Sequence, residues 1–187
     1  MELHTDRLLL RPFRVDDLDR LASWQSLPEV ARYTYWEPST REQVEPMLAR
    51  WIEATRLERD DDAVTLAVER PADGLLLGSV TIFLRSLEHR QVEVGYVFHP
   101  DAGGRGYATE ATRALIDFAF AELGAHRVFA RTDARNVASA ALCRRLGMRE
   151  EAHLREAEIF KGEWGDELVF AVLDREWCPG AGPGPSD

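Results

Sequence analysis

The sequence predicts an α+β (mixed α/β) fold, in which helices pack on both faces of a central mixed, mostly antiparallel sheet of about seven strands. Two pairs of apolar, strand-like runs are each joined by a short turn sequence, which predicts antiparallel hairpins. A strand pattern at residues 91–98 is followed by a helical pattern and another strand at 127–132, which predicts one parallel pair.

Length and composition are those of an ordinary globular domain. The chain has 187 residues, of which 45% are apolar and 30% charged, so it can bury its own core. We expect a single domain over residues 1–177 and a flexible C-terminal tail over 178–187, which is mostly Pro, Gly and Ser. These values exclude a mainly disordered chain, a collagen, a coiled coil and a disulfide scaffold.

One strand and two helices are expected in the N-terminal third. Residues 7–13 read as the strand, and Asp17 suits the positive N-terminus of the short helix that follows. Residues Thr40 and Gln43 match a capping box, which predicts the start of an amphipathic second helix. Pro46 conflicts with a helix interior and predicts a kink or a later start.

Three strands are expected in the middle of the chain. Residues 64–69 and 75–84 read as two strands around a turn at 71–74. Apolar residues alternate with others over 91–98, which is typical of a half-buried strand. Gly95 within this strand predicts a bulge or a close approach of another backbone.

Two helices and three strands are expected in the last part of the domain. A helix with an apolar stripe ends at Gly124 and is followed by the strand at 127–132. Asn136 is placed as the N-cap of a second helix that ends near Leu146. The final strands are expected at residues 150–160 and 167–173, paired around a turn.

The charge and the cysteine content limit the partners and the compartment. The chain has 33 acidic and 23 basic residues, a formal net charge of −10, which argues against a nucleic-acid partner. No apolar run reaches the roughly 20 residues of a membrane span, and no signal-peptide pattern is present, so no membrane partner is expected. The two cysteines fit a reducing, cytoplasmic compartment, and the five histidines show no metal-ligand spacing.

A glycine-rich loop at residues 101–109 is the strongest candidate binding site, with the sequence Asp-Ala-Gly-Gly-Arg-Gly-Tyr-Ala-Thr. Glycines let a phosphate approach the unpaired N–H groups of a helix start, and Arg105 adds a cation. A tight turn without a ligand is the alternative from the loop alone. A dinucleotide fingerprint is disfavoured, because Thr109 stands at its third glycine position and only one β-α-β unit is present.

Together these segments resemble the GNAT superfamily of acetyl-CoA-dependent N-acetyltransferases. They are most similar to its RimJ/RimL type, which acetylates protein N-termini, including those of ribosomal proteins. The resemblance runs from Thr5 to Trp177 and depends on the order and spacing of several motifs. These motifs are TDRLLLRP at 5–12, LPEV at 27–30, VEVGY at 92–96, GRGYATEA at 104–111, NVAS at 136–139, LGM at 146–148 and KG at 161–162.

The resemblance implies acetyl-CoA as the donor, with its pyrophosphate on the backbone amides of the glycine loop, and no metal. In the family pattern Q/R-x-x-G-x-G/A, Gly106 and Ala108 fit the last two positions. Gly103 replaces the usual Gln or Arg, which removes a side chain but no backbone donor. The implied cofactor-binding residues are Val97, Phe98, Gly103, Gly104, Arg105, Gly106, Tyr107, Ala108, Thr109, Asn136 and Ser139.

The implied reaction is direct attack of a neutral amine on the thioester carbonyl, which needs a base for the ammonium proton and a donor for the leaving thiolate. Two carboxylates compete as the base, namely Glu158, which looks like the RimL-type catalytic glutamate, and Glu93 on the 91–98 strand. Ser139 matches the serine of the RimL-type pattern, and we hypothesise that it donates a proton to the leaving thiolate. The structural alternatives are a solvated Glu158, an ion-paired Glu93 and a Ser139 that only supports its helix start.

The expected acceptor is a protein or peptide N-terminal amine. The alternatives are a small amine, such as a polyamine, an aminoglycoside or an amino acid, and a non-catalytic module that binds CoA or a partner protein. Four aromatic residues are candidates for the wall of the acceptor pocket, with a core or lid role as the alternative: Trp24, Tyr33, Tyr35 and Trp36. A homodimer is common in the resembled group.

Overall fold

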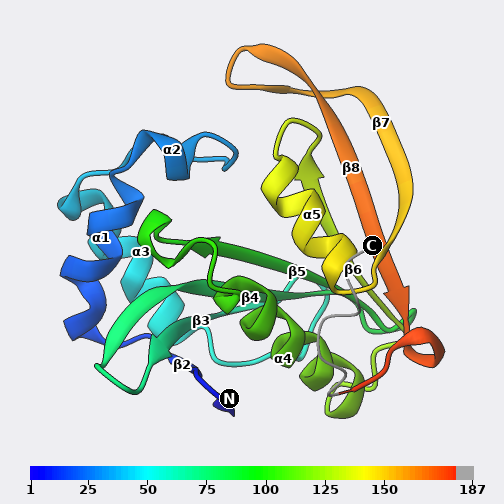
Figure 1. The fold of residues 1–187 in the computed structure, drawn as a ribbon, viewed down its shortest axis with the longest axis horizontal. Coiled ribbons are helices and arrows are strands. Elements are labelled where there is room, and N and C mark those ends of the chain that lie inside the picture. Colours follow the sequence, from blue (N-terminus) through cyan, green and yellow to red (C-terminus); the bar gives the residue numbers. More distant parts are fainter. Residues whose placement is uncertain (180–187) are drawn as a thin grey trace.

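The computed structural model describes residues 1–179, which fold around one eight-stranded sheet of order β1-β2-β3-β4-β5-β6-β8-β7 (Figure 1). The strands are β1 (Leu3–His4), β2 (Leu9–Pro12), β3 (Ala63–Arg70), β4 (Leu75–Ser86), β5 (Gln91–Phe98), β6 (Arg127–Asp133), β7 (Arg149–Phe160) and β8 (Glu163–Leu173). The α-helices are α1 (Leu18–Gln25), α2 (Pro28–Ala31), α3 (Arg41–Glu53), α4 (Tyr107–Ala121) and α5 (Val137–Arg145).

The strand pairing confirms the predicted mixed sheet. Every pair of neighbouring strands is antiparallel except β5 and β6, which are parallel as the β-α-β pattern predicted. The sheet has eight strands rather than about seven. The additional strand is β1, whose two residues pair with Leu9 and Leu10 and are too few to show a periodic pattern.

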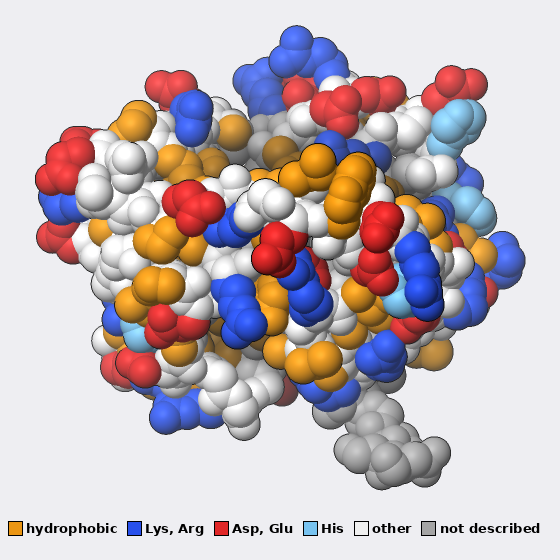
Figure 2. Space-filling view, turned by 90° about the horizontal axis from the view of Figure 1, so that it is seen from above, with side chains coloured by type: hydrophobic (Ala, Val, Ile, Leu, Met, Phe, Trp, Pro, Cys, Tyr) orange, Lys and Arg blue, Asp and Glu red, His pale blue; other side chains and the backbone are white. Residues whose placement is uncertain are grey.

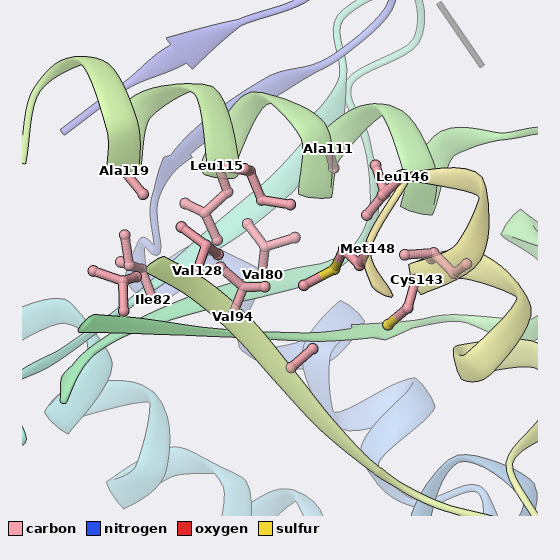
Figure 3. Close-up of a cluster of buried hydrophobic side chains, with 14 of the residues drawn as sticks. Val80, Ile82, Val94, Ala111, Leu115, Ala119, Val128, Cys143, Leu146 and Met148 are labelled. Atoms are coloured by element: carbon pink, nitrogen blue, oxygen red, sulfur yellow. The ribbon is translucent and has the colours of Figure 1, made fainter. Parts of the chain in front are cut away.

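Helices cover both faces of the sheet and enclose two hydrophobic clusters. The larger cluster lies between the sheet and helices α4 and α5. In Figure 3, Ala111, Leu115 and Ala119 of α4 point toward Val80, Ile82, Val94 and Val128 of the sheet, and Cys143, Leu146 and Met148 continue the cluster. The smaller cluster, between the other face and helices α1 and α3, contains Phe13, Leu18, Leu21, Trp24, Val44, Leu48, Ala67 and Leu76.

Three local expectations need correction. The loop expected between the first two helices contains the short α2, which starts at Pro28, because proline suits the first helical turn. The capping box is present, with the Thr40 N–H donating to Gln43 Oε1 over 2.8 Å. Helix α3 therefore starts at Arg41 and includes Pro46, so a later start is wrong. Strand β8 begins at Glu163, because the hairpin turn uses only two residues.

A buried ionic cluster fixes β2 to the start of α1. The Arg11 guanidinium donates to both carboxylate oxygens of Asp17, over 2.7 and 2.8 Å, and its Nε donates to Glu69 over 2.6 Å. The side chains of Arg11 and Asp17 are only 5% and 9% exposed. These hydrogen bonds raise the pKa of Arg11, with Asp17 contributing most. The cluster offsets the cost of burying two charges by satisfying most of their hydrogen-bonding groups.

The last observations on the fold concern the end of the chain, membrane-spanning helices and the surface charge. Of the expected tail at 178–187, residues 180–187 lie outside the described residues. None of the helices within residues 1–179 is long and apolar enough to cross a bilayer. Acidic and basic side chains are interspersed over the face in Figure 2, with no extended basic area on it.

Candidate active site

A cleft of about 860 Å³ opens where β5 and β6 part. The two strands pair only from Gln91 to Glu93, opposite 127–129, and then diverge. On its other side, β5 stays paired with β4 as far as Phe98. The β5 edge that faces β6 is therefore open at Val97 and Phe98, both of which line the cleft. An extended ligand can take the place of the missing strand neighbour there, as the resemblance implies for the pantetheine arm.

Gly78 of β4 makes the close strand packing beside this edge possible. A Cβ atom at Gly78 would overlap the carbonyl oxygen of Val97 and also meet Phe98. The two strands therefore lie closer here than any other residue would permit. Gly95, where a bulge or close approach was expected, pairs regularly with Thr81 of β4.

The glycine loop joins β5 to α4 and turns on two left-handed glycines. Gly104 and Gly106 have φ angles of +72° and +77°, and Gly106 is the N-cap of the 15-residue helix α4. Side chains with a Cβ atom rarely adopt this backbone region. Arg7 holds the loop from outside, because its Nη1 donates to the Arg105 carbonyl over 3.0 Å and its Nε donates to Glu110 over 2.7 Å.

Positive charge gathers on the outer side of the glycine loop. A cavity of about 450 Å³ is lined there by three arginines, Arg20, Arg70 and Arg105, together with Tyr107 and a single carboxylate, Asp101. Arg70 donates to the Tyr107 hydroxyl over 3.2 Å, which lowers the pKa of that tyrosine. This local charge on a chain of net charge −10 favours an anion at the loop. The loop, its helix start and the arginines thus fit the pyrophosphate of a CoA donor.

The N-terminus of α5 supplies the opposite wall of the cleft. Asn136 is the N-cap, and its Oδ1 accepts a hydrogen bond from the Ser139 N–H over 3.1 Å. Both residues line the cleft. The predicted capping role of Asn136 is therefore present. Arg145, near the end of α5, approaches Thr109 of α4 to 3.5 Å.

Tyr96 of β5 joins Ser139, and sequence reasoning missed it. The Tyr96 hydroxyl lies 2.8 Å from Ser139 Oγ, 3.2 Å from the Ser139 carbonyl and 3.5 Å from Cys143 Sγ. Burial raises the pKa of Tyr96 well above its usual value, so the phenol keeps its proton. A protonated Tyr96 and Ser139 thus form a hydrogen-bonded pair of potential donors beside the end of β5.

Glu93 lies in the cleft as an ion-pair partner. Its Oε2 accepts a hydrogen bond from Arg85 Nε over 2.7 Å, and its Oε1 accepts one from Arg131 Nε over 3.1 Å. Both oxygens are thus occupied by guanidinium groups on a side chain that is only 10% exposed. A carboxylate whose two oxygens are already engaged has little room to contact an acceptor amine, so the geometry favours the structural alternative for Glu93.

Glu158 faces the cleft from a bulge in β7. The register of β7 against β8 shifts between Leu154 and Glu158, where Glu156 has a φ of +47°. Bulges of this kind redirect side chains and are common beside active sites. Glu158 Oε1 accepts a hydrogen bond from the Tyr35 hydroxyl over 2.8 Å. Desolvation and this hydrogen bond raise the pKa of Tyr35 to about 12.

Lys161 connects the tip of the β7–β8 hairpin to the α2–α3 loop. Its Nζ donates to the carbonyls of Ala31 and Trp36, each over 2.9 Å, and lies 3.3 Å from Glu37 Oε1. Phe160 packs edge-to-face on Tyr35 with 5.6 Å between the ring centroids. Two segments far apart in the sequence are thereby joined across one end of the cleft.

Three further carboxylates and three of the aromatic candidates also line the cleft. Asp133, Asp166 and Glu167 line it together with Glu158. Of the aromatic candidates, Tyr33, Tyr35 and Trp36 line the cleft. Trp24 is fully buried in the smaller hydrophobic cluster instead, which is the core role left open as its alternative.

The glycine-loop candidates lie at different depths. Ala108 lines the cleft, whereas Arg105 and Tyr107 line the outer cavity. Thr109 is buried, and Gly103, Gly104 and Gly106 are exposed on the loop itself. No group of three or more His, Cys, Asp or Glu side chains within residues 1–179 could hold a metal ion.

Comparison with known proteins decides the family. Residues 7–149 match the family described as an acetyltransferase (GNAT) domain. This chain belongs to the GNAT family. It is therefore an acetyl-CoA-dependent N-acetyltransferase, and the open β5 edge and the glycine loop are where its own residues suit the donor. Family membership confirms the enzyme class, the fold and the donor that the resemblance implied.

Three relatives illustrate the match. "Uncharacterized N-acetyltransferase p20" of Bacillus licheniformis is 30% identical over 176 residues, 94% of this chain and 98% of p20. "Putative ribosomal N-acetyltransferase YdaF" of Bacillus subtilis is 33% identical over 105 residues, 56% of this chain and 57% of that protein. The crystal structure of a GNAT acetyltransferase from Bacillus anthracis superposes with a TM-score of 0.85 and 27% identity, covering 94% of this chain and 100% of that one.

Proposed function

We propose that this N-acetyltransferase acts on the N-terminal amine of a protein or peptide, as RimJ/RimL-type enzymes do. One observation carries the proposal, namely the joined end of the cleft, where Tyr35 binds Glu158 and where the cleft lining also includes Asp166 and Glu167. Carboxylates attract the ammonium form of an amine. Tyr35 is 73% exposed, so this end of the cleft meets the surface and leaves room for the rest of a large acceptor.

The acceptor amine attacks the thioester carbonyl of acetyl-CoA directly, within a ternary complex. The C–N bond forms as the C–S bond breaks, so the enzyme must accept a proton on one side and supply one on the other. Ser139, supported by Tyr96, is the proposed donor for the leaving thiolate. Glu158 and Glu167 are both available as proton acceptors, whereas the arginine-bound Glu93 is not.

A polyamine is the second candidate acceptor. Asp133, Glu158, Asp166 and Glu167 line one cleft, which favours an acceptor with more than one ammonium group. The protein named "Spermidine N(1)-acetyltransferase" of Escherichia coli is 23% identical over 172 residues. One relative is named for spermidine and another, YdaF, is named as a ribosomal acetyltransferase, so the experiment compares both kinds of acceptor.

The test is an acetylation assay with two probes, a short peptide with a free N-terminus and spermidine, read by mass spectrometry. The matched control is the same peptide with its N-terminus already acetylated. Acetylation of the free peptide, none of the blocked peptide and a much slower reaction of spermidine would support the main proposal. Efficient acetylation of spermidine with an inert peptide would replace it with the polyamine candidate. Acetyl-CoA binding without transfer to any amine would favour a non-catalytic module.

Three further proposals concern the extent of the domain, its assembly and its location. We propose an acetyltransferase domain over residues 1–177, a homodimeric assembly and a cytoplasmic location. Both Cys143 and Cys178 are free thiols, which supports a reducing compartment. Sedimentation velocity of the full chain measures the assembly state directly, and a purely monomeric profile would contradict the dimer.

A further inference from the structure

We propose that Glu167 takes the proton from the acceptor ammonium, and that Glu158 and Tyr35 hold this ammonium in position. The inference rests on the proposed acceptor end of the cleft. It replaces the two bases that the sequence suggested with a third residue, which no motif indicated. Glu167 would be a catalytic residue because it contacts the reacting amine, whereas Glu158 orients the amine.

Glu167 stands where three strands meet on the cleft side of the sheet. It lies on β8, opposite Asp133 of β6 and Leu154 of β7 in the strand register. Its carboxylate approaches the Arg131 guanidinium to 3.7 Å, and Arg131 in turn binds Glu93. The residue lines the cleft, and its strand is hydrogen-bonded to a neighbour on each side, β6 and β7, which holds its backbone in place.

The three carboxylates differ in what already occupies them. Glu93 accepts hydrogen bonds from two arginines through its two oxygens. Glu158 accepts one from the Tyr35 hydroxyl through Oε1. Glu167 accepts none from any side chain or backbone within residues 1–179, although its side chain is only 14% exposed. Apart from the 3.7 Å contact with Arg131, the Glu167 oxygens are therefore free to accept hydrogen bonds, either from water or from a bound acceptor ammonium.

The surroundings also raise the pKa of Glu167. Burial raises its pKa above the ordinary 4.5, Glu158 and Glu93 add to this rise, and Arg131 opposes it. A carboxylate with a raised pKa is a better proton acceptor while it is still ionised near neutral pH. The other charged and titratable groups that line the cleft are Glu29, Tyr33, Tyr35, Arg50, Glu93, Tyr96, Arg131, Asp133, Arg145, Glu158 and Asp166.

The proposed step balances as follows. The acceptor ammonium gives one proton to the Glu167 carboxylate and becomes a neutral amine. Its nitrogen lone pair forms the C–N bond with the thioester carbonyl carbon, and the C–S electron pair leaves with sulfur. The second nitrogen proton passes to water. The thiolate takes a proton from the Ser139 hydroxyl, and water then gives Ser139 a new proton. Glu167 returns its own proton to solvent. Overall, the acetyl group moves from sulfur to nitrogen, CoA leaves as the thiol, and one net proton is released to solvent.

The test compares the pH profiles of kcat/KM for wild type, Glu167→Gln, Glu158→Gln and the control Glu163→Gln. Glu163 belongs to the same hairpin, and its side chain is 78% exposed. The substrate is whichever of the free peptide and spermidine the wild type acetylates. The base works only when ionised, so the wild-type rate falls as pH drops through the raised pKa of Glu167, above the ordinary 4.5.

We expect Glu167→Gln to lower kcat by roughly 100-fold, the lower end of general-base effects, and to remove this acid limb. The KM for acetyl-CoA and the melting temperature should stay at the wild-type values. Glu158→Gln should raise the acceptor KM and keep the acid limb, and Glu163→Gln should change neither. An acid limb that persists in Glu167→Gln, or that disappears in Glu158→Gln, would overturn the assignment. Absence of wild-type turnover with any amine would instead refute the proposed function itself.

Discussion

Replacing Lys161 by Met tests whether the hairpin connection shapes the acceptor end of the cleft. The substitution keeps most of the apolar stem but removes the ammonium that donates to the carbonyls of Ala31 and Trp36. A hydrogen bond from a charged group contributes about 1.5–3 kcal/mol, and the exposed contact with Glu37 contributes little. Because the Lys161 side chain is 26% exposed, we discount the two bonds to about 1–2 kcal/mol in total.

The two hydrogen bonds join the α2–α3 loop, which carries Tyr35, to the hairpin, which carries Glu158. Their free energy therefore stabilises the relative positions of these two side chains. If this whole free energy contributes to acceptor binding, its loss raises the acceptor KM by roughly 5- to 30-fold, since 1.4 kcal/mol corresponds to tenfold. Steady-state kinetics with each substrate varied in turn measures this, with Glu163→Gln as the control on the same hairpin. The acetyl-CoA KM should not change, because the donor end of the cleft lies on α4, α5 and β5. An unchanged acceptor KM, or an equal rise for both substrates, would refute the reasoning.

Three further substitutions test other parts of the structure. Tyr96→Phe removes the hydroxyl bonded to Ser139 and should lower kcat by about tenfold at an unchanged acetyl-CoA KM; an unaltered kcat in steady-state assays would contradict the donor pair. Gly78→Ala places a Cβ against the β5 carbonyl and should cost about 1–3 kcal/mol and weaken acetyl-CoA binding by calorimetry; wild-type affinity and stability would show that the strands do not need this close approach. Arg11→Met leaves Asp17 buried without its cation and should destabilise the fold by about 3–5 kcal/mol in urea; a loss below 1 kcal/mol would mean that the buried pair is dispensable.

Much of the fold could be predicted because its local signals agree with its tertiary structure. The capping box at Thr40 and the β-α-β order each have one strong physical interpretation, and the structure contains both. The exceptions are features whose energy comes from distant contacts. Pro46 stays inside α3 although it lacks an N–H, because Val44 and Leu48 on either side are buried against the sheet and α1.

The site was predictable only where backbone chemistry defines it. The glycine loop follows from residue types alone, whereas the role of a carboxylate depends on what lies across the fold from it. Glu93 and Glu158 look equivalent in sequence, and only the positions of Arg85, Arg131 and Tyr35 separate them. The alternation of β5 placed Tyr96 on the apolar face without showing that α5 brings Ser139 to its hydroxyl.

The most direct test of the account is amide hydrogen exchange with and without acetyl-CoA. The account predicts slower exchange in two segments, the end of β5 at residues 94–98 and the glycine loop with the start of α4 at 103–109. Exchange in the β4–β5 turn at residues 87–90 and at the start of β7 at residues 149–153, which line neither the cleft nor the outer cavity, should stay as it is in the free protein. Protection confined to other segments, or none at saturating acetyl-CoA, would contradict the assignment of the donor to the opening between β5 and β6.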